Sequence, residues 1–401
     1  MNPMLKKISA ILATIAAVVL LPLVWPTIKY KGNLPQDFFK FPPEMTDYGA
    51  KAPFNIYIFI GFSIFCTFII LLYIFPQWFG FKKIKVVSEL NLKKKAPFPV
   101  WFFFGVFLLI VSLIILWGKF SEPKILVNWA LIPLFWSAVF VVDGLVYYRT
   151  IGKSIINTRP HTIIAIAVCS IGGWTYFEYL NFFVKENWYY PSGNLISTEQ
   201  FIIYSLLGST GLLTIVFEMY TLLKSFKHLA VKYSQGPKVN ISRKTWKIIY
   251  VISLFIMLMI SVLPDQLFFI LWLGPLFALL AILSLQNTWT PFTPLAKGNW
   301  TPVALVCLAY LIQGFFYEGW NYFSAIHLEH NQVISYNPGF WMYSVPYVDK
   351  FHIFEMPILG YFGYLPFGLF CWVAWLVFAN LLGIDHKFSD DEDADPTTVE
   401  I

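Results

Sequence analysis

Two segments of this chain repeat one order of residue types that could carry out acid–base chemistry. In the first segment, Glu178 and Asn181 lie three residues apart, Trp188 and Tyr190 follow, and Glu199 comes near the start of the next apolar stretch. Residues three apart share one face of a helix, so this acid and this amide would point the same way. A carboxylic acid kept neutral by apolar surroundings can protonate an alkene, and this is the chemistry we consider for the motif.

The second segment has the same order, with Glu318 and Asn321, then Trp341 and Tyr343, then Glu355 at the start of the last expected span. Similarity of this kind within one chain indicates an internal duplication. Because carboxylates inside a membrane are costly and usually face the bundle interior, we expect the two copies to meet around one cavity near the outer leaflet. The alternative is that these residues form only an ordinary polar and aromatic belt at helix ends.

The residues of the two copies receive matching roles in this hypothesis. Glu199 and Glu355 would act as acid and base, with Glu178 and Glu318 as supporting charges. The two asparagines would fix side-chain orientations through hydrogen bonds, and the aromatic rings would stabilise a carbocation. The residues expected to contact substrate are Asn181, Asn321, Trp188, Tyr190, Trp341 and Tyr343.

Composition places these motifs in a membrane. Hydrophobic residues make up 58% of the 401 residues and charged residues only 12%, about half the charged share of a soluble domain. The mean hydropathy is +0.65. Several apolar runs are long enough to cross about 30 Å of hydrocarbon as helices. The sequence predicts an all-α polytopic membrane bundle with about ten spans, at 8–28, 54–78, 98–118, 125–147, 162–184, 201–223, 248–264, 266–286, 301–324 and 353–383.

Basic residues indicate the orientation of these spans. With the N-terminus inside, 20 of the 28 Lys and Arg residues fall on inner segments, as the positive-inside rule requires. This pattern predicts a multi-pass protein of the cell (inner) membrane with both termini cytoplasmic. The first apolar stretch has a basic start and no small-residue cleavage site after it, so we expect an uncleaved first span.

The chain divides into five expected regions. Pro and Asp at 264 and 265 predict a tight turn between two spans, because both are poor residues inside a membrane helix. The regions are three N-terminal spans with a basic cytoplasmic loop (1–124), a first three-helix repeat (125–247), an extra span (248–265), a second three-helix repeat (266–385) and an acidic disordered tail (386–401).

The last expected span is rich in residues that disturb or thin a helix. Pro residues remove backbone hydrogen bonds and Gly residues remove side chains, so this helix is expected to be kinked or closely packed. A flat or elongated apolar ligand could lie in a groove beside it. The residues concerned are Pro357, Gly360, Gly363, Pro366 and Gly368.

The sequence predicts no metal site and no cofactor. His327 and His330 could share a metal with His352, but the first copy has no matching histidines. The four cysteines lie in apolar runs without zinc spacing, and phosphate loops and dinucleotide motifs are absent. Basic residues lie beside the spans, so we expect no nucleic-acid partner. The expected partner is a membrane lipid or isoprenoid, with a membrane partner subunit as a further possibility.

The duplicated three-helix unit, with its acid and amide, Trp-x-Tyr and later Glu, resembles the membrane-embedded lycopene cyclases of the heterodimeric and fungal-fusion type. The likeness covers about 125–224 and 266–383. It implies two small three-helix units that together act on a long apolar polyene in carotenoid biosynthesis, without a metal or a Rossmann domain. The family's paired acids after Pro correspond here to the single carboxylates Glu199 and Glu355.

These observations favour a protein that acts on an apolar, lipid- or isoprenoid-like substrate by acid-catalysed cyclisation or isomerisation. Two other functions fit the same sequence. One is a transporter or flippase of a lipid-like solute, in which two repeats rock about a central cavity. The other is a non-catalytic membrane subunit that binds partner helices or lipids.

Overall fold

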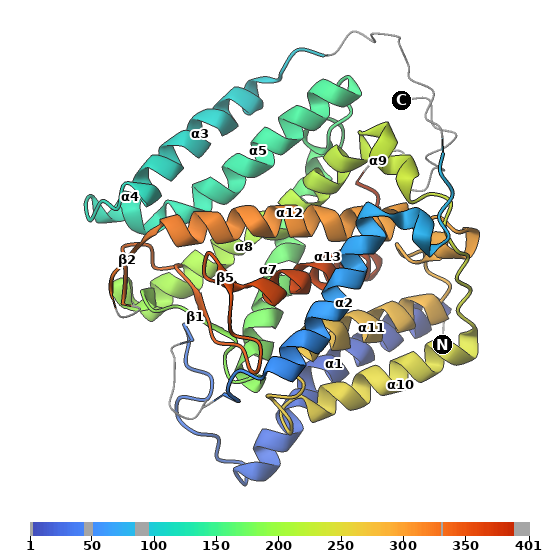
Figure 1. Ribbon diagram of the computed structural model, residues 1–401, viewed down its shortest axis with the longest axis horizontal. Coiled ribbons are helices and arrows are strands. Elements are labelled where there is room, and N and C mark those ends of the chain that lie inside the picture. Colours follow the sequence, from blue (N-terminus) through green and yellow to red (C-terminus); the bar gives the residue numbers. More distant parts are fainter. Residues whose placement is uncertain (1–2, 44–50, 85–95, 330–331, 389–401) are drawn as a thin grey trace.

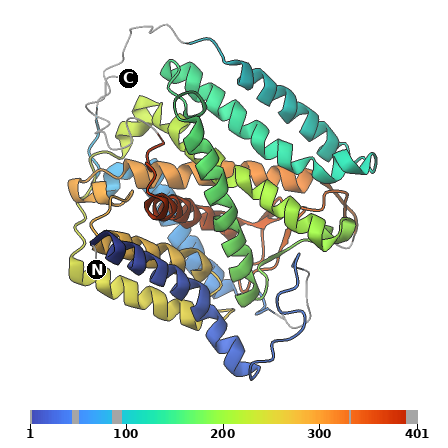
Figure 2. The same cartoon turned by 180° about the vertical axis from the view of Figure 1, so that it is seen from behind.

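The computed structural model describes residues 3–43, 51–84, 96–329 and 332–388 as a bundle of helices (Figure 1; Figure 2). The predicted tail therefore lies outside the described residues from 389 onward. The main helices are α1 (Pro3–Lys29), α2 (Ile56–Ile74), α3 (Val100–Trp117), α5 (Leu131–Thr150), α7 (Pro160–Phe183), α8 (Thr198–Lys224), α10 (Arg243–Met259), α11 (Ile270–Leu285), α12 (Thr301–Phe323) and α13 (Tyr364–Leu382).

Eight helices among the described residues are long and apolar enough to cross a membrane, which establishes a multi-pass membrane protein. They include every main helix except α10 and α11, which have 17 and 16 residues. The short elements between them are α4 (Lys124–Trp129), α6 (Ile155–Thr158), α9 (Lys227–Lys232), η2 (Pro76–Phe79), η3 (Gly193–Leu195) and η4 (Thr293–Lys297).

Outer and inner helices differ in what their apolar side chains contact. On α2 and α3, Ile64 and Phe107 are 67% and 63% exposed. Apolar surface on this scale is stable in hydrocarbon and unfavourable in water. In the middle of the bundle, Trp372 and Trp375 of α13 are fully buried. The bundle thus has an apolar surface suited to lipid around a packed aromatic core.

The central helices form two sets with similar internal packing. Helices α5 and α7 both pack along α8, and α11 and α12 both pack along α13. Between the sets, α8 lies against α12 and α13 lies against α7. Helix α3 covers α5, and α10 covers α11 with α1 beside it (Figure 2).

Three two-stranded β-ladders gather at one end of the bundle, at the left in Figure 1. Strand β1 (Trp188–Tyr189) pairs with β4 (Met342–Tyr343), and in their antiparallel register Trp188 lies opposite Tyr343. The connections after α7 and after α12 are therefore joined by backbone pairing. The other two pairs are β2 (Ala325–His327) with β3 (Val333–Ser335), and β5 (His352–Ile353) with β6 (Met356–Pro357).

The opposite end of the bundle brings together the start of α1 and the segment after α13. The side chain of Gln286, just after α11, donates to the carbonyl of Lys7 at 3.0 Å. Arg159, just before α7, forms an ion pair with Asp385 at 3.0 Å. The first and last spanning helices therefore begin and end on the same side.

Local sequence signals explain where the helices near the β-ladders begin. Ser197 accepts a hydrogen bond from the backbone of Gln200, whose side chain accepts one from the Ser197 backbone. This capping box satisfies two backbone donors at the start of α8. Asn55 caps α2 by accepting from Tyr57 and Ile58. At the opposite end of the bundle, Pro160 opens α7, a position where proline costs no helical hydrogen bond.

The predicted span 353–383 is wrong at its start. Residues 352–357 form the β5–β6 hairpin, and η6 (Ile358–Gly363) is a 3₁₀ segment that leads into α13. Pro357 cannot donate a backbone hydrogen bond, and Gly360 and Gly363 weaken a helix. The full α-helix consequently begins only at Tyr364.

The expected turn at 264–265 is present between α10 and α11. Asp265 in this turn forms an ion pair with Lys185, which follows α7, at 2.8 Å. The α10–α11 turn therefore lies at the same end of the bundle as the β-ladders.

Candidate functional site

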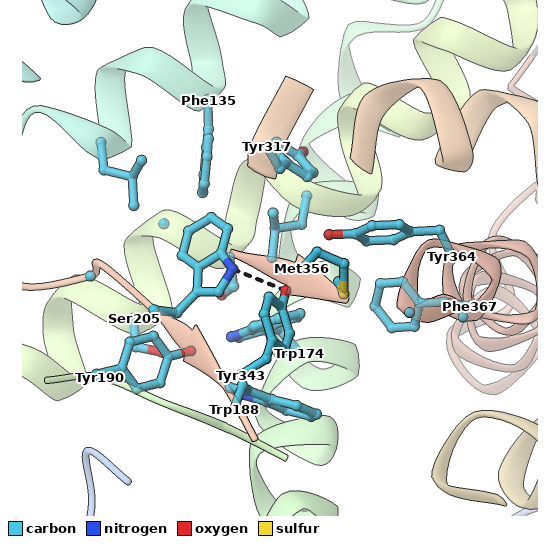
Figure 3. A pocket seen from close by; sticks show the side chains of 18 of the residues that line it. Phe135, Trp174, Trp188, Tyr190, Ser205, Tyr317, Tyr343, Met356, Tyr364 and Phe367 are labelled. Atoms are coloured by element: carbon cyan, nitrogen blue, oxygen red, sulfur yellow. Dashed lines mark hydrogen bonds between the residues drawn. The ribbon is translucent and has the colours of Figure 1, made fainter. Parts of the chain in front are cut away.

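A cavity of about 130 Å³ lies between the two sets of helices, next to the β1–β4 ladder. Its walls come from α5, α7, α8, α11, α12 and α13 together with the ladder, so residues from both sequence motifs surround it (Figure 3). The lining is almost entirely apolar and rich in rings. Among the lining residues are Trp174, Trp188, Tyr190, Trp272, Trp341 and Tyr343.

Glu178 of α7 lies behind this wall and is held by two residues of the wall. The hydroxyl of Tyr190 donates to Oε1 of Glu178 at 2.5 Å. The indole Nε1 of Trp188 lies 3.2 and 3.3 Å from the two carboxylate oxygens. Asn181, one turn later, donates from Nδ2 to the carbonyl of Trp188 at 2.8 Å and so fixes the strand that carries both rings.

Glu318 of α12 has a similar set of neighbours. The hydroxyls of Tyr343 and Tyr364 donate to its Oε1 at 2.7 and 2.5 Å. The side chain of Asn321 pairs with the backbone of Trp341 in both directions, donating to the carbonyl at 2.8 Å and accepting from the amide at 3.0 Å. The indole of Trp341 in turn donates to the Tyr343 hydroxyl at 3.0 Å (Figure 3).

The two carboxyl groups are thus separated from the cavity by the aromatic residues that bind them. Glu178 and Glu318 are 3% and 0% exposed, and neither belongs to the cavity wall. A group in the cavity would meet tyrosine and tryptophan rings first. The hydroxyls of Tyr190, Tyr343 and Tyr364 provide the shortest hydrogen-bonded connection from the wall to an acid.

Electrostatics keep the protons on Tyr190, which follows β1, and on Tyr343 of β4. Burial, and then the nearby charge of Glu178, raise the pKa of Tyr190 well above its ordinary value. Burial and then Glu318 raise the pKa of Tyr343 in the same way. Both hydroxyls therefore remain donors at physiological pH.

Glu199 departs from its expected position. It lies in the exposed first turn of α8, where it accepts a hydrogen bond from the Ser197 hydroxyl at 2.8 Å. An acid in the first turn of a helix is stabilised by the helix dipole and the free backbone N–H groups. Glu199 does not line the cavity, and the expectation that it would join Glu178 in a buried site is wrong.

Glu355 lies in the turn of the β5–β6 hairpin rather than at the start of a helix. Its Oε1 is 2.6 Å from Nε2 of His327, and the carboxylate side chain is 11% exposed. The next residue, Met356, lines the cavity. Glu355 is therefore at the edge of the site and pairs with a histidine, in place of the expected direct contact with substrate.

The histidines that the structure describes do not assemble around a metal position. His327 is in a strand and stacks on Tyr322, with ring centroids 4.1 Å apart, while His352 contacts Asp349 at 2.8 Å. His330 lies outside the described residues. Across residues 3–43, 51–84, 96–329 and 332–388, no group of three or more His, Cys, Asp and Glu side chains could hold a metal ion.

Several wall residues were not anticipated from the sequence motifs. Tyr364 supplies a second hydroxyl to Glu318 from the glycine-rich stretch, for which the sequence predicted a ligand groove but no role for this tyrosine. Trp174 and Trp272 line the cavity from α7 and α11. A signal existed for Trp174, since it lies four residues before Glu178 and so shares its helix face. Trp272 belongs to a uniformly apolar run and carried no such signal.

Comparisons with known proteins give no family to which this site can be assigned. No protein-family model, no curated protein and no solved structure matches the chain.

Proposed function

We propose that the chain contains two copies of a helical unit related by an approximate twofold axis through the β1–β4 ladder. In the ladder, Tyr189 lies opposite Met342, and these are the middle residues of the two Trp-x-Tyr motifs. Trp188, the first residue of one motif, lies opposite Tyr343, the last of the other. The α8–α12 and α7–α13 contacts follow the same exchange. Because α3 covers α5 as α10 covers α11, the unit we propose has four helices, one more than the sequence motif indicated.

The same proposal covers the ten spans and their orientation. Helices α10 and α11 are each roughly 25 Å long, slightly less than the hydrocarbon thickness. We propose that each of them crosses the membrane, with the turn between them supplying the remaining depth. An even number of spans places both termini on one side. The distribution of basic residues supports the cytoplasm as that side, and we propose the cell membrane as the membrane that is spanned.

The function that this geometry supports best is binding and proton-catalysed rearrangement of an apolar, isoprenoid-like ligand in the central cavity. The observation that carries the proposal is that the buried acids Glu178 and Glu318 are hydrogen-bonded by one and two tyrosines of the cavity wall, respectively. Buried membrane carboxyls are expensive and imply a use. Rings on several sides of the cavity provide both apolar contact and electron-rich faces for a cationic intermediate.

The proposed reaction needs no external reactant. A protonated Glu318 or Glu178 donates to its tyrosine oxygen, while that tyrosine passes its hydroxyl proton to an alkene carbon of the ligand. The resulting carbocation rearranges beside the tryptophan rings and then loses a proton from a neighbouring carbon. That proton returns to the tyrosine and carboxylate, so the net change is an isomerisation or a cyclisation. The resemblance to membrane-embedded lycopene cyclases, expected from the sequence motifs, is part of this proposal.

A transport function is the second candidate. It is favoured by the twofold arrangement proposed above, because transporters built from repeats commonly place such an arrangement around a central cavity. A lipid-like solute would then leave unchanged, and the acids would couple its movement to protons.

One experiment separates these functions. Full-length protein would be purified, its retained lipids extracted and analysed by mass spectrometry, and the variants Glu178→Gln and Glu318→Gln compared with it. We expect an isoprenoid-like ligand in all three proteins. The ratio of unreacted to rearranged ligand should rise by at least about 100-fold in the variant that removes the proton donor, the usual contribution of a general acid.

Glu199→Gln is the matched control, because it makes the same change at an exposed carboxylate outside the cavity. Its ligand ratio should equal that of the unaltered protein. One chemical form of the ligand in every protein would exclude catalysis and favour transport. Retention of ordinary phospholipid alone would contradict ligand binding and indicate a non-catalytic subunit.

A further inference from the structure

Helices α1 and α10 lie side by side, and both begin at the end of the bundle opposite the β-ladders (Figure 2). The hydroxyl groups of Thr14 and Tyr250 are 2.9 Å apart. Further along, the hydroxyl of Ser261 donates to the carbonyl of Pro22 at 2.7 Å. Residue numbers rise together in these two contacts, so the helices run in the same direction with a defined register.

This register brings basic residues of the two helices together. Lys7 is seven residues before Thr14, and Arg243 is seven residues before Tyr250. Seven residues are about two helical turns, or about 10 Å, so each basic residue lies on the same side of its helix as the residue in the contact. Lys7 and Arg243 are therefore at the same level on either side of the line of contact between α1 and α10. Lys247 lies between Arg243 and Tyr250 on this face of α10.

No acidic side chain balances these charges. Lys6 and Lys244 are next in sequence to Lys7 and Arg243, and all five residues of this basic cluster (Lys6, Lys7, Arg243, Lys244 and Lys247) are exposed. None of them forms an ion pair within the part of the chain that the structure describes. The helices α1 and α10 contain no Asp or Glu, and neither does α11 beside them. Because like charges at this spacing repel each other, a bound anion would stabilise the cluster.

An apolar stripe continues from the basic cluster along α10. Ile248, Val251 and Phe255 follow Lys244 at intervals of four, three and four residues, which is the spacing of one helix face. Val251 and Phe255 are 64% and 60% exposed. In a multi-pass membrane protein, an apolar face of this kind contacts lipid tails. Cations at the start of the helix and apolar side chains below them match the headgroup and the acyl chain of one lipid.

We infer that the basic cluster binds the headgroup of a phospholipid with two phosphates, whose acyl chains lie along α10. The inference is independent of the proposed cavity function. One phosphate would leave most of the five charges unbalanced, whereas two phosphates can be shared between α1 and α10. The guanidinium of Arg243 can hold a phosphate through two hydrogen bonds, and the lysines act as point charges. Basic pockets between membrane helices bind headgroups of this chemistry.

The test measures lipid binding by native mass spectrometry of the full chain in a neutral detergent. Cardiolipin, which has two phosphates, is compared with phosphatidylglycerol, which has one. We expect cardiolipin to bind the unaltered protein with a Kd about tenfold lower or less. The double variant Lys7→Gln/Arg243→Gln should raise the cardiolipin Kd by about 30-fold, because each basic residue near a membrane surface contributes about fivefold to the binding of an anionic lipid.

Lys82→Gln/Lys83→Gln is the control, because it removes two exposed charges at the same end of the bundle, outside the basic cluster. Its cardiolipin Kd should equal that of the unaltered protein. Equal Kd values in the two double variants would overturn the inference, and so would equal binding of the two lipids by the unaltered protein.

The folding of the double variant is checked in the same detergent without lipid. Removing Lys7 and Arg243 charges relieves repulsion, so Lys7→Gln/Arg243→Gln should unfold at the same temperature as the unaltered protein or higher. Should it not fold, the comparison of the two lipids on the unaltered protein decides: a lower Kd for cardiolipin supports the inference, and equal Kd values overturn it.

Discussion

At the scale of single residues, the two asparagines position the aromatic wall. Asn321 occupies both backbone hydrogen-bonding groups of Trp341, as a neighbouring strand would. Asn181 satisfies only the carbonyl of Trp188, and its own Oδ1 is buried without a partner among the described residues. The two asparagines therefore differ in how firmly they hold their strands.

Replacing these asparagines with alanine should have unequal effects. Asn321→Ala leaves a backbone N–H and a carbonyl of Trp341 unmet and should lower the free energy of unfolding by about 2–4 kcal/mol. Asn181→Ala should cost about 1–2 kcal/mol, because one protein hydrogen bond is lost. Thermal unfolding of the purified variants, followed by size-exclusion chromatography with fluorescence detection, would check the order. A larger loss for Asn181→Ala would contradict this account.

At the scale of elements, a glycine lets α12 and α13 approach each other beside the site. A methyl group at Gly314 would overlap the ring of Tyr364. That ring must stay where it is to donate to Glu318 and to pack on Tyr310, 5.7 Å away between centroids. The small residue thus sets the distance between the helix that carries the acid and the helix that carries its donor.

Gly314→Ala should accordingly destabilise the protein by about 1–3 kcal/mol, the usual cost of overpacking, and weaken ligand retention. Gly172→Ala on α7 is the matched control, because nothing lies within 4 Å of an added methyl group there. Alanine is the better helix former, so the control should unfold at the same temperature or slightly higher. Thermal unfolding midpoints in one detergent would compare them, and equal midpoints would refute the packing argument.

At the scale of the whole molecule, a lysine joins the segment before α2 to the connections that follow α7 and α12. The ammonium of Lys51 donates to the carbonyl of Glu186 at 2.7 Å and also to the carbonyl of Ser344. Burial lowers the pKa of Lys51 to about 7, and the nearby charge of Glu186 offsets only part of this effect. Both motif loops are therefore held by a group that loses its charge near neutral pH.

This shift predicts how stability depends on pH. Between pH 7 and about 10.5, the unfolded lysine still binds a proton that the folded one has released, so this group makes stability rise with pH. The unfolding temperature of the unaltered protein, relative to that of Lys51→Met, should increase as pH rises from 7 to 10. Lys350→Met, at an exposed lysine, should show a constant difference. If the unfolding temperature of the unaltered protein instead falls relative to that of Lys51→Met as pH rises, the lowered pKa of Lys51 cannot be the cause.

The sequence determined the class of the protein and most of the spanning segments. Long apolar runs leave a helix in lipid as the only way to satisfy the backbone, so eight long helices appear where hydropathy placed them. The turn at Pro264 and Asp265 was also predicted from the sequence and is present in the structure. These features depend on neighbours along the chain.

Only the tertiary structure decided which acids belong to the site. Glu178 and Glu318 are buried behind tyrosines because the β1–β4 ladder closes over both helices, and that ladder pairs segments more than 150 residues apart. Glu199 shows the limit of the motif: its place in the order of residue types matched that of Glu355, yet it lies at an exposed helix start beside a capping box. The local sequence pattern determines the secondary structure of a segment, whereas packing between distant segments determines which groups its side chains contact.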